Sequence, residues 1–363
     1  MNEIICISVI LSCIISCVAT RGVLKFAHSR KLYDTQNERK IHKGHIPRLG
    51  GVAIAFATIA TMAIIAVYER YFGDMKFAAY FATHSKLIVC SILALFLITI
   101  TGLLDDLVGF RYRTKFAVQI AAGALICYSG FWINNFHGLF GLYHLDVWQG
   151  WLLTIFTIVL ITNAINFIDG IDGLAGTLNL CLFVFYFSVA YTYSQMAALV
   201  VTVPVIGALI PFLYFNIFGD PEKKRKIFMG DTGSLFFGFL VSVICVDITN
   251  RSENIFGATP IAVAYCPLIV PCFDLARVVV NRLYENRNPF KADKTHIHHL
   301  LLSIVSSQRK TLAIVVALSL LITIMSILLS LDFNVNLVFV FDVVIWIVVM
   351  MVIYRKLDKK QDK

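Results

Sequence analysis

Apolar runs of about 20 residues alternate along the chain with short polar segments that carry most of the charge. A run of this length is what an α-helix needs to cross the hydrocarbon core of a bilayer. The pattern therefore predicts an all-α protein with about eleven membrane-spanning helices. The expected spans are 4–24, 50–68, 87–104, 115–131, 151–165, 174–194, 197–218, 234–250, 258–281, 311–331 and 337–354. Proline residues within two of these spans are expected to kink the helices; they are Pro204, Pro211, Pro267 and Pro271.

The composition supports a membrane protein made of one integral domain, residues 1–363. Of the 363 residues, 59% are hydrophobic and 15% are charged, whereas about a quarter of a soluble domain is charged. The first apolar run lacks a preceding basic segment and is long enough to remain as an anchor rather than a cleaved signal peptide. The nine cysteines form no CxxC pair and lie in apolar runs, which predicts core thiols rather than disulfides or a metal site.

Lys and Arg are distributed unevenly between the two sides of the predicted spans. One set of alternate loops carries 25 of these residues and the other set carries four. By the positive-inside rule this places the N-terminus outside and the C-terminus in the cytoplasm. The net charge of +9 is spread over loops between apolar segments, so it indicates orientation and contact with membrane lipid rather than nucleic-acid binding.

The same alternation places five polar motifs on the predicted cytoplasmic side, within residues 33–302. In chain order they are Asp34–His42 with Pro47-Arg48-Leu49-Gly50-Gly51, Asp105-Asp106, Asn163–Gly173, Met229–Ser234 and Asp293–His299. The predicted outer loops contain no comparable cluster. Chemistry at the cytoplasmic face, with access from both bilayer and cytosol, is the natural interpretation.

The third motif is the most unusual for a membrane protein. Asn163, Asn166, Asp169 and Asp172 recur at every third position after an apolar run, so the first three would share one side of a continuing helix. Amides and carboxylates at the end of a membrane helix are costly unless they hold something polar. The alternative is a polar helix cap and turn, where Asn, Asp and Gly are also favoured.

The second and fourth motifs indicate phosphate and metal chemistry. Adjacent acids such as Asp105 and Asp106 repel each other unless a cation lies nearby, and Mg²⁺ commonly bridges one or two carboxylates and substrate phosphates. Gly230 to Gly233 precede an expected helix, whose free N–H groups could bind phosphate while Asp231 holds a metal. The alternatives are solvated acids for the pair and a simple N-cap formed by Asp231 or Thr232.

The fifth motif contains three histidines in four residues. His296, His298 and His299 follow Lys294, and the other motifs supply acids rather than cysteines, which suits a hard cation better than zinc. The imidazoles are therefore interpreted as donors to phosphate. Solvated histidines in a loop are the alternative.

Together these motifs resemble those of the polyprenyl-phosphate N-acetylhexosamine-1-phosphate transferases, glycosyltransferase family 4 in the broad sense. The resemblance covers residues 33–302. It is carried by Pro47-Arg48-Leu49-Gly50-Gly51, Gly102-x-x-Asp105-Asp106, Asn163-x-x-Asn166-x-x-Asp169-Gly170-x-Asp172-Gly173, Met229-Gly230-Asp231-x-Gly233-Ser234 and His296-Ile297-His298-His299. The chain looks closer to the bacterial enzymes that begin O-antigen, enterobacterial common antigen or teichoic acid assembly than to the peptidoglycan translocase branch. That branch typically has three consecutive histidines.

The resemblance implies transfer of a sugar 1-phosphate from a UDP-N-acetylhexosamine, by default N-acetylglucosamine, to undecaprenyl phosphate, with release of UMP. This would be the first membrane step of cell-envelope polysaccharide synthesis, at the cytoplasmic face of a bacterial plasma membrane. It implies Mg²⁺, with Mn²⁺ as a substitute, and is compatible with a homodimer. The implied metal ligands are Asp231 and Asn166, the catalytic pair is Asp105 and Asp106, and the nucleotide-sugar side comprises Lys115, Asn163, Asp169, Asp172, His296, His298 and His299. The sugar, the pathway and the choice between covalent and direct attack stay open.

The competing class is a membrane transporter. Transporters also carry intramembrane acids and broken helices, but they usually place the acids near the bilayer midplane within internal repeats. Here the acids fall at predicted helix ends and the sequence shows no repeat. A phosphatidyltransferase that uses a CDP-alcohol would also need Mg²⁺, but its expected Asp-Gly-x-x-Ala-Arg spacing is absent.

Overall fold

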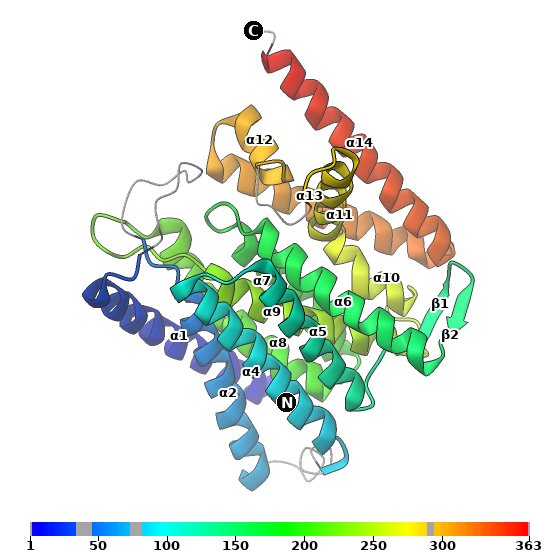
Figure 1. Ribbon diagram of the computed structural model, residues 1–363. Coiled ribbons are helices and arrows are strands. Elements are labelled where there is room, and N and C mark those ends of the chain that lie inside the picture. Colours follow the sequence, from blue (N-terminus) through cyan, green and yellow to red (C-terminus); the bar gives the residue numbers. More distant parts are fainter. Residues whose placement is uncertain (1, 34–45, 73–81, 289–293, 362–363) are drawn as a thin grey trace. The chain divides into compact units, whose positions relative to one another are not determined.

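The computed structural model describes residues 2–33, 46–72, 82–288 and 294–361, and nearly all of them are helical (Figure 1). Ten helical spans in these residues are long and apolar enough to cross a membrane, so the prediction of an all-α, multi-pass membrane protein is confirmed. The spans are α1 (Asn2–Arg30), α2 (Gly50–Phe72), α4 (Ser85–Val108), α6 (Val147–Ile168), α7 (Leu174–Thr192), α8 (Met196–Phe218), α9 (Gly230–Thr249), α10 to α11 (Pro260–Tyr284), α13 (Gln308–Asp332) and α14 (Val335–Gln361).

The predicted span 115–131 corresponds to α5 (Tyr112–Tyr128), which has only 17 residues. This is shorter than the roughly 20 residues that a crossing usually needs. One further helix, α12 (Ile297–Val305), lies in a segment that the hydrophobic pattern assigned to a loop. Its nine residues are too few to cross a bilayer.

Prolines act differently in two of the spans. The expected helix 258–281 is divided into α10 (Pro260–Tyr265), a 3₁₀ turn η1 (Cys266–Leu268) and α11 (Ile269–Tyr284). Pro267 lies inside the 3₁₀ turn, where its missing N–H and fixed φ interrupt the α-helical hydrogen bonds as expected. By contrast, α8 continues through Pro204 and Pro211 as a single helix.

A short β-hairpin was not predicted from the sequence. Strand β1 (Asn135–Leu139) pairs antiparallel with β2 (Leu142–His144), with Leu139 opposite Leu142. The two connecting residues, Phe140 and Gly141, both have positive φ, as two-residue hairpin turns require. Three- and five-residue strands are too short to give a period-two pattern.

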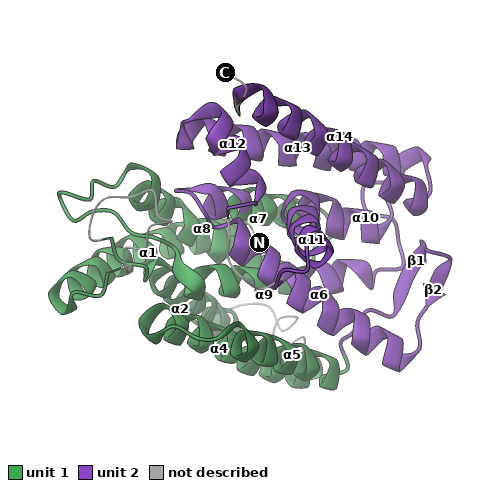
Figure 2. Ribbon diagram, turned by 45° about the horizontal axis from the view of Figure 1, so that its top comes forward, with its two compact units in different colours: residues 1–130, 179–240 green, residues 131–178, 241–363 purple. Residues whose placement is uncertain are grey.

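By its internal contacts the chain forms two compact units (Figure 2). Unit 1 comprises residues 1–130 and 179–240. Its helix α1 packs against α2 and α8. Small residues line the buried side of α1, and the hydroxyls of Ser12 and Ser16 donate to the carbonyls of Pro204 and Ala208 in α8, at 2.5 and 2.7 Å. Small residues allow such close approach between membrane helices. Helix α4 packs against α5 in the same unit.

Unit 2 comprises residues 131–178 and 241–363. Helix α6 packs against α11, and α12 packs against both α13 and α14. Within the membrane-spanning part, buried Asp342 of α14 accepts a hydrogen bond from Ser326 of α13. Helices α7 and α9 continue from one unit into the other.

Candidate active site

Charged side chains from four segments of unit 1 meet at the ends of its helices. Lys115, near the start of α5, places its Nζ atom 3.0 Å from Asp105 Oδ2 and 2.6 Å from Asp231 Oδ2. Arg48, just before α2, lies 3.6 Å from the other oxygen of Asp231. The Lys115, Asp105 and Asp231 side chains are only 12–20% exposed. An ammonium group therefore lies between two largely buried carboxylates.

Asp106 has a different environment from its neighbour Asp105. One of its oxygens accepts from the backbone N–H of Asp231 at 2.8 Å, and the other accepts from the N–H and the hydroxyl of Thr232, at 2.9 and 2.6 Å. Helix α9 begins at Gly230, so Asp231 and Thr232 lie in its first turn, where backbone N–H groups lack helical partners. The motif thus opens the helix, as expected. The alternative that Asp231 or Thr232 is a simple N-cap is wrong, because the carboxylate that accepts from these N–H groups is that of Asp106 in α4.

The segment that carries Asp231 is held by the Pro47–Gly51 motif. Phe228 N–H donates to Pro47 O, and Gly51 N–H donates to Met229 O, both at 2.8 Å. The next residue, Gly230, has a φ of +73°, and a Cβ there would lie 2.0 Å from the carbonyl oxygen of Arg48. A side chain at this position would therefore push apart the two backbone segments whose hydrogen bonds position Asp231. The other half of the first motif, residues 34–42, lies outside the described residues.

The carboxylates of unit 1 suit a hard cation in type and charge. Asp105 and Asp231 offer oxygen ligands, and Mg²⁺ commonly uses one or two carboxylates together with substrate phosphates. Among the described residues, no group of three or more His, Cys, Asp or Glu side chains could hold a metal by itself. The donor set therefore fits an ion that is completed by substrate, with Lys115 supplying the positive charge between the two carboxylates in this structure.

In unit 2, helix α6 ends in the most polar motif of the sequence. A capping box at Asp146 and Gln149 begins this helix, which continues to Ile168, three residues further than predicted. Asn163 and Asn166 therefore lie in its last two turns, Asp169 follows its final residue, and Asp172 lies in the turn before α7. Asn163 is 8% exposed and donates to the carbonyl of Val159.

The histidine motif forms the start of α12 rather than a solvated loop. His296 precedes the helix, and His298 and His299 lie in its first turn. His296 and His298 are buried, so the alternative of solvated loop histidines is wrong for these two. The ring of His296 stacks on Phe167 at the end of α6, with the ring centroids 5.5 Å apart. The end of α6 and the start of α12 are thus adjacent within unit 2.

Asp274 of α11 is a residue that the sequence analysis missed. Its side chain is 1% exposed, and it accepts from His296 Nδ1 at 2.8 Å, from Arg277 Nη2 at 2.7 Å and from the backbone N–H of Ile297 at 3.1 Å. Arg277 Nη2 also donates to the carbonyl of Thr295 at 2.6 Å. Hydrogen bonds therefore hold the residues on both sides of His296. The available signal was an acid within a predicted membrane span, with Arg277 three residues later, because charged residues there are costly unless they are paired.

His298 is buried without a hydrogen-bond partner. Neither ring nitrogen finds one among the described residues, although the side chain is 1% exposed. Burial, with a smaller effect of the neighbouring His299 and His296, lowers the pKa of His298 to about 3, so the ring is neutral near pH 7. A neutral imidazole can offer one N–H donor and one acceptor. Buried polar atoms normally have partners, so an unpartnered pair indicates a place for a ligand.

Gly170 allows this arrangement. A Cβ at Gly170 would lie 1.9 Å from Nε2 of His298, so any other residue in the turn after α6 would displace the imidazole. The need for glycine at position 170 therefore comes from its close approach to His298, which lies 128 residues later in the sequence.

Comparison with known proteins shows what this chain is similar to. The model of the family described as "Glycosyl transferase family 4" matches residues 87–249. A protein of Bacillus subtilis (strain 168) named "Probable undecaprenyl-phosphate N-acetylglucosaminyl 1-phosphate transferase" is 28% identical over 90% of this chain and 85% of its own length. The chain is therefore similar to glycosyl transferase family 4 proteins over this region.

Other proteins similar to this chain carry related names. Proteins of Escherichia coli O157:H7 and Yersinia pestis, both named "Undecaprenyl-phosphate alpha-N-acetylglucosaminyl 1-phosphate transferase", are each 26% identical. The first similarity covers 80% of this chain and 74% of the relative, and the second covers 78% and 73%. The family 4 match, residues 87–249, includes Asp105, Lys115 and Asp231 but ends before the histidine motif. Helices α11 and α12 lie outside the matched residues, so their contacts are known from the structure and not from the family model.

Proposed function

We propose that the chain transfers a sugar 1-phosphate from a UDP-N-acetylhexosamine, with N-acetylglucosamine as the first candidate, to undecaprenyl phosphate. In this reaction an oxygen of the lipid phosphate bonds to the phosphorus that carries the sugar, and the bond from that phosphorus to the oxygen of UMP breaks. The products are undecaprenyl diphosphate-sugar and UMP. The relatives' names support the acceptor and the transferred group.

The observation that carries this proposal is Lys115 between Asp105 and Asp231 at the ends of membrane helices. Phosphoryl transfer depends mainly on positioning and on neutralising the charge of the phosphates. With the three carboxylates of Asp105, Asp106 and Asp231 against the two cations of Arg48 and Lys115, the cluster has a formal charge of −1. A phosphate alone would be repelled by this charge, so a divalent cation is the natural third component.

We assign the metal to Asp231 and Asp105. When bound, Mg²⁺ supplies charge neutralisation at the phosphates. Lys115 offsets the repulsion between the two carboxylates, and its ammonium group could also donate to a phosphate oxygen. Asp106 keeps the first turn of α9 in position, because its oxygens are engaged by Asp231 and Thr232.

We assign the nucleotide-sugar to unit 2. Buried His298 offers an unpartnered N–H that can donate to a diphosphate oxygen, and Asp274 fixes the neighbouring His296 and the start of α12. Asn163, Asp169 and Asp172 offer amides and carboxylates for the uridine and sugar hydroxyls. In a bacterial cell this reaction would begin the assembly of an envelope polysaccharide, on the cytoplasmic face of the plasma membrane.

The test uses the purified full chain in detergent with undecaprenyl phosphate, Mg²⁺ and a panel of radiolabelled UDP-sugars. We expect lipid-linked label and an equal amount of UMP with at least one UDP-N-acetylhexosamine. The reaction should stop in excess chelator and with Asp231→Asn, because a neutral amide holds a hard cation poorly. The variant should remain folded by thermal unfolding. Absence of lipid-linked product with every donor would reject the proposed reaction, and full turnover in chelator would remove the metal from it.

A further inference from the structure

A second acidic site lies in unit 1, far along α2 from the candidate active site. Glu69 is 7% exposed although it belongs to a membrane-spanning helix. It lies 18 residues after Gly51, so the two positions are about 27 Å apart along the helix axis. Glu69 forms no hydrogen bond or ion pair with any other described residue, and it takes no part in the chemistry assigned to Asp105 and Asp231.

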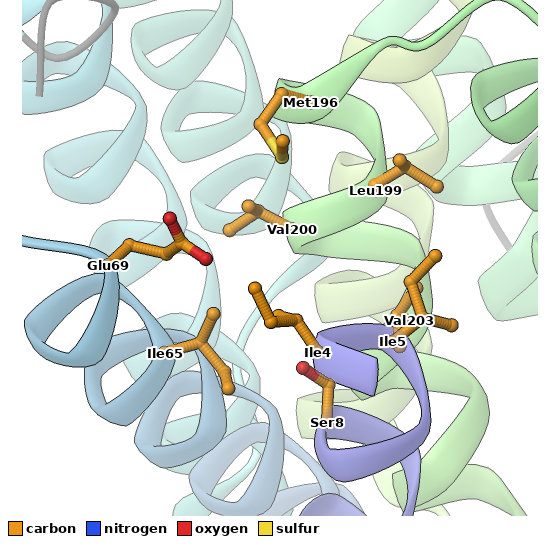
Figure 3. Close-up of a pocket in the computed structure, with 9 residues that line it drawn as sticks. All are labelled: Ile4, Ile5, Ser8, Ile65, Glu69, Met196, Leu199, Val200 and Val203. Atoms are coloured by element: carbon orange, nitrogen blue, oxygen red, sulfur yellow. The ribbon is translucent and has the colours of Figure 1, made fainter. Parts of the chain in front are cut away.

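The carboxylate of Glu69 faces a small apolar cavity between α1, α2 and α8. The cavity has a volume of about 40 Å³, and its lining includes Ile4, Ser8, Ile65, Met196 and Val200 (Figure 3). This volume holds a water-sized polar group. Met196 is 38% exposed, so the cavity reaches the surface of the unit.

The surroundings of this cavity indicate the level of lipid headgroups. Tyr68, Tyr71 and Phe72 of α2 are 46%, 76% and 79% exposed, and aromatic side chains gather at membrane–water interfaces. Apolar residues of the same helices, such as Ile7 and Ile64, are also exposed and suit contact with acyl chains. A group that enters the cavity from this side would therefore come from the lipid headgroup layer.

An unpartnered acid in an apolar cavity selects for a small cation. A buried carboxylate is costly unless it is paired, and the other polar side chain named in the lining, Ser8, can contribute a hydroxyl but no positive charge. We propose that Glu69 binds the primary ammonium group of a phosphatidylethanolamine headgroup. The trimethylammonium group of phosphatidylcholine has the same charge, but three methyl groups must then fit into about 40 Å³ and no N–H remains to donate.

Native mass spectrometry of the delipidated full chain tests this site. The chain is mixed with phosphatidylethanolamine and phosphatidylcholine that have identical acyl chains. We expect one phosphatidylethanolamine to be retained in preference to phosphatidylcholine. Glu69→Gln should weaken its binding about tenfold or more, the size expected for losing a hydrogen bond to a charged group. Glu3→Gln, at an exposed position in the first turn of α1, is the matched control and should bind as the wild type does.

The headgroup series on the wild-type chain gives a second test that needs no variant. Affinity should fall as one, two and three methyl groups are added to the ammonium nitrogen. A flat series, equal binding by Glu69→Gln and wild type, or preferential retention of phosphatidylglycerol would each overturn the proposal. None of these measurements uses transferase activity, so their outcome is separate from that of the proposed reaction.

Discussion

Replacing Asp274 by asparagine removes the negative charge that connects α11 to the start of α12. The aspartate is 1% exposed and accepts three hydrogen bonds, from His296, Arg277 and Ile297. Asparagine keeps the shape but has one acceptor oxygen in place of two, and its NH₂ group would face a donor. Arg277, whose side chain is 11% exposed, would lose its counter-ion.

The expected loss of stability follows from burial. Breaking a buried charged pair by neutralising one partner costs about 3–5 kcal/mol. The matched control is Asp247→Asn, which removes the ion pair between Asp247, near the end of α9, and Arg251, which follows that helix. The Asp247 side chain is 40% exposed, and exposed pairs contribute about 0–1 kcal/mol. Thermal unfolding in detergent should therefore show a clear shift for Asp274→Asn and little or none for Asp247→Asn.

Kinetics should separate a positioning role for Asp274 from a purely structural one. If Asp274 positions α12, Asp274→Asn should raise the KM for the UDP-sugar about tenfold or more at a temperature where the variant is fully folded. The apparent KM for undecaprenyl phosphate should change much less. Equal stability and equal donor KM in Asp274→Asn, Asp247→Asn and wild type would refute the reasoning. A change in kcat alone would place Asp274 with the chemistry instead.

Three further predictions follow from the two clusters. Gly170→Ala should lower kcat/KM for the UDP-sugar at least tenfold, since its Cβ would lie 1.9 Å from His298. The control Gly22→Ala, whose Cβ would meet no atom within 4 Å, should leave kcat/KM unchanged, and equal kinetics for the two variants would contradict the contact. Between pH 6.5 and about 3 the unfolded chain binds a proton at His298 that the folded chain does not, so the free energy of unfolding should fall by about 1.4 kcal/mol per pH unit of acidification. Denaturant titrations should show this loss to be smaller in His298→Gln, and identical pH profiles would argue against burial of a neutral ring. Lys115→Met should lower kcat while reducing the Mg²⁺ concentration needed for half-maximal activity, because the amine no longer competes for the carboxylates; metal titrations check this, and an unchanged metal requirement would place the ion elsewhere.

Local pattern in the sequence determined the class of fold and the position of the polar motifs along it. Length and apolarity of each run are sufficient to recognise a membrane helix, since every backbone group must be satisfied within the helix itself. The same pattern placed Asp105 at the end of α4 and Asn163 near the end of α6, as the structure has them. Where the local pattern was weak it failed, because the nine-residue α12 was taken for a loop.

Only the tertiary structure decided which polar groups are partners. Asp106 caps a helix that begins 124 residues later, and Lys115 lies between two acids of which one is 116 residues away. No period or spacing encodes such contacts, because they depend on how helices pack rather than on the conformation of one segment. Asp274 shows the same limit: in the sequence it is one acid in an apolar span, and its role exists only because α11 and α12 bring His296 within 2.8 Å of it.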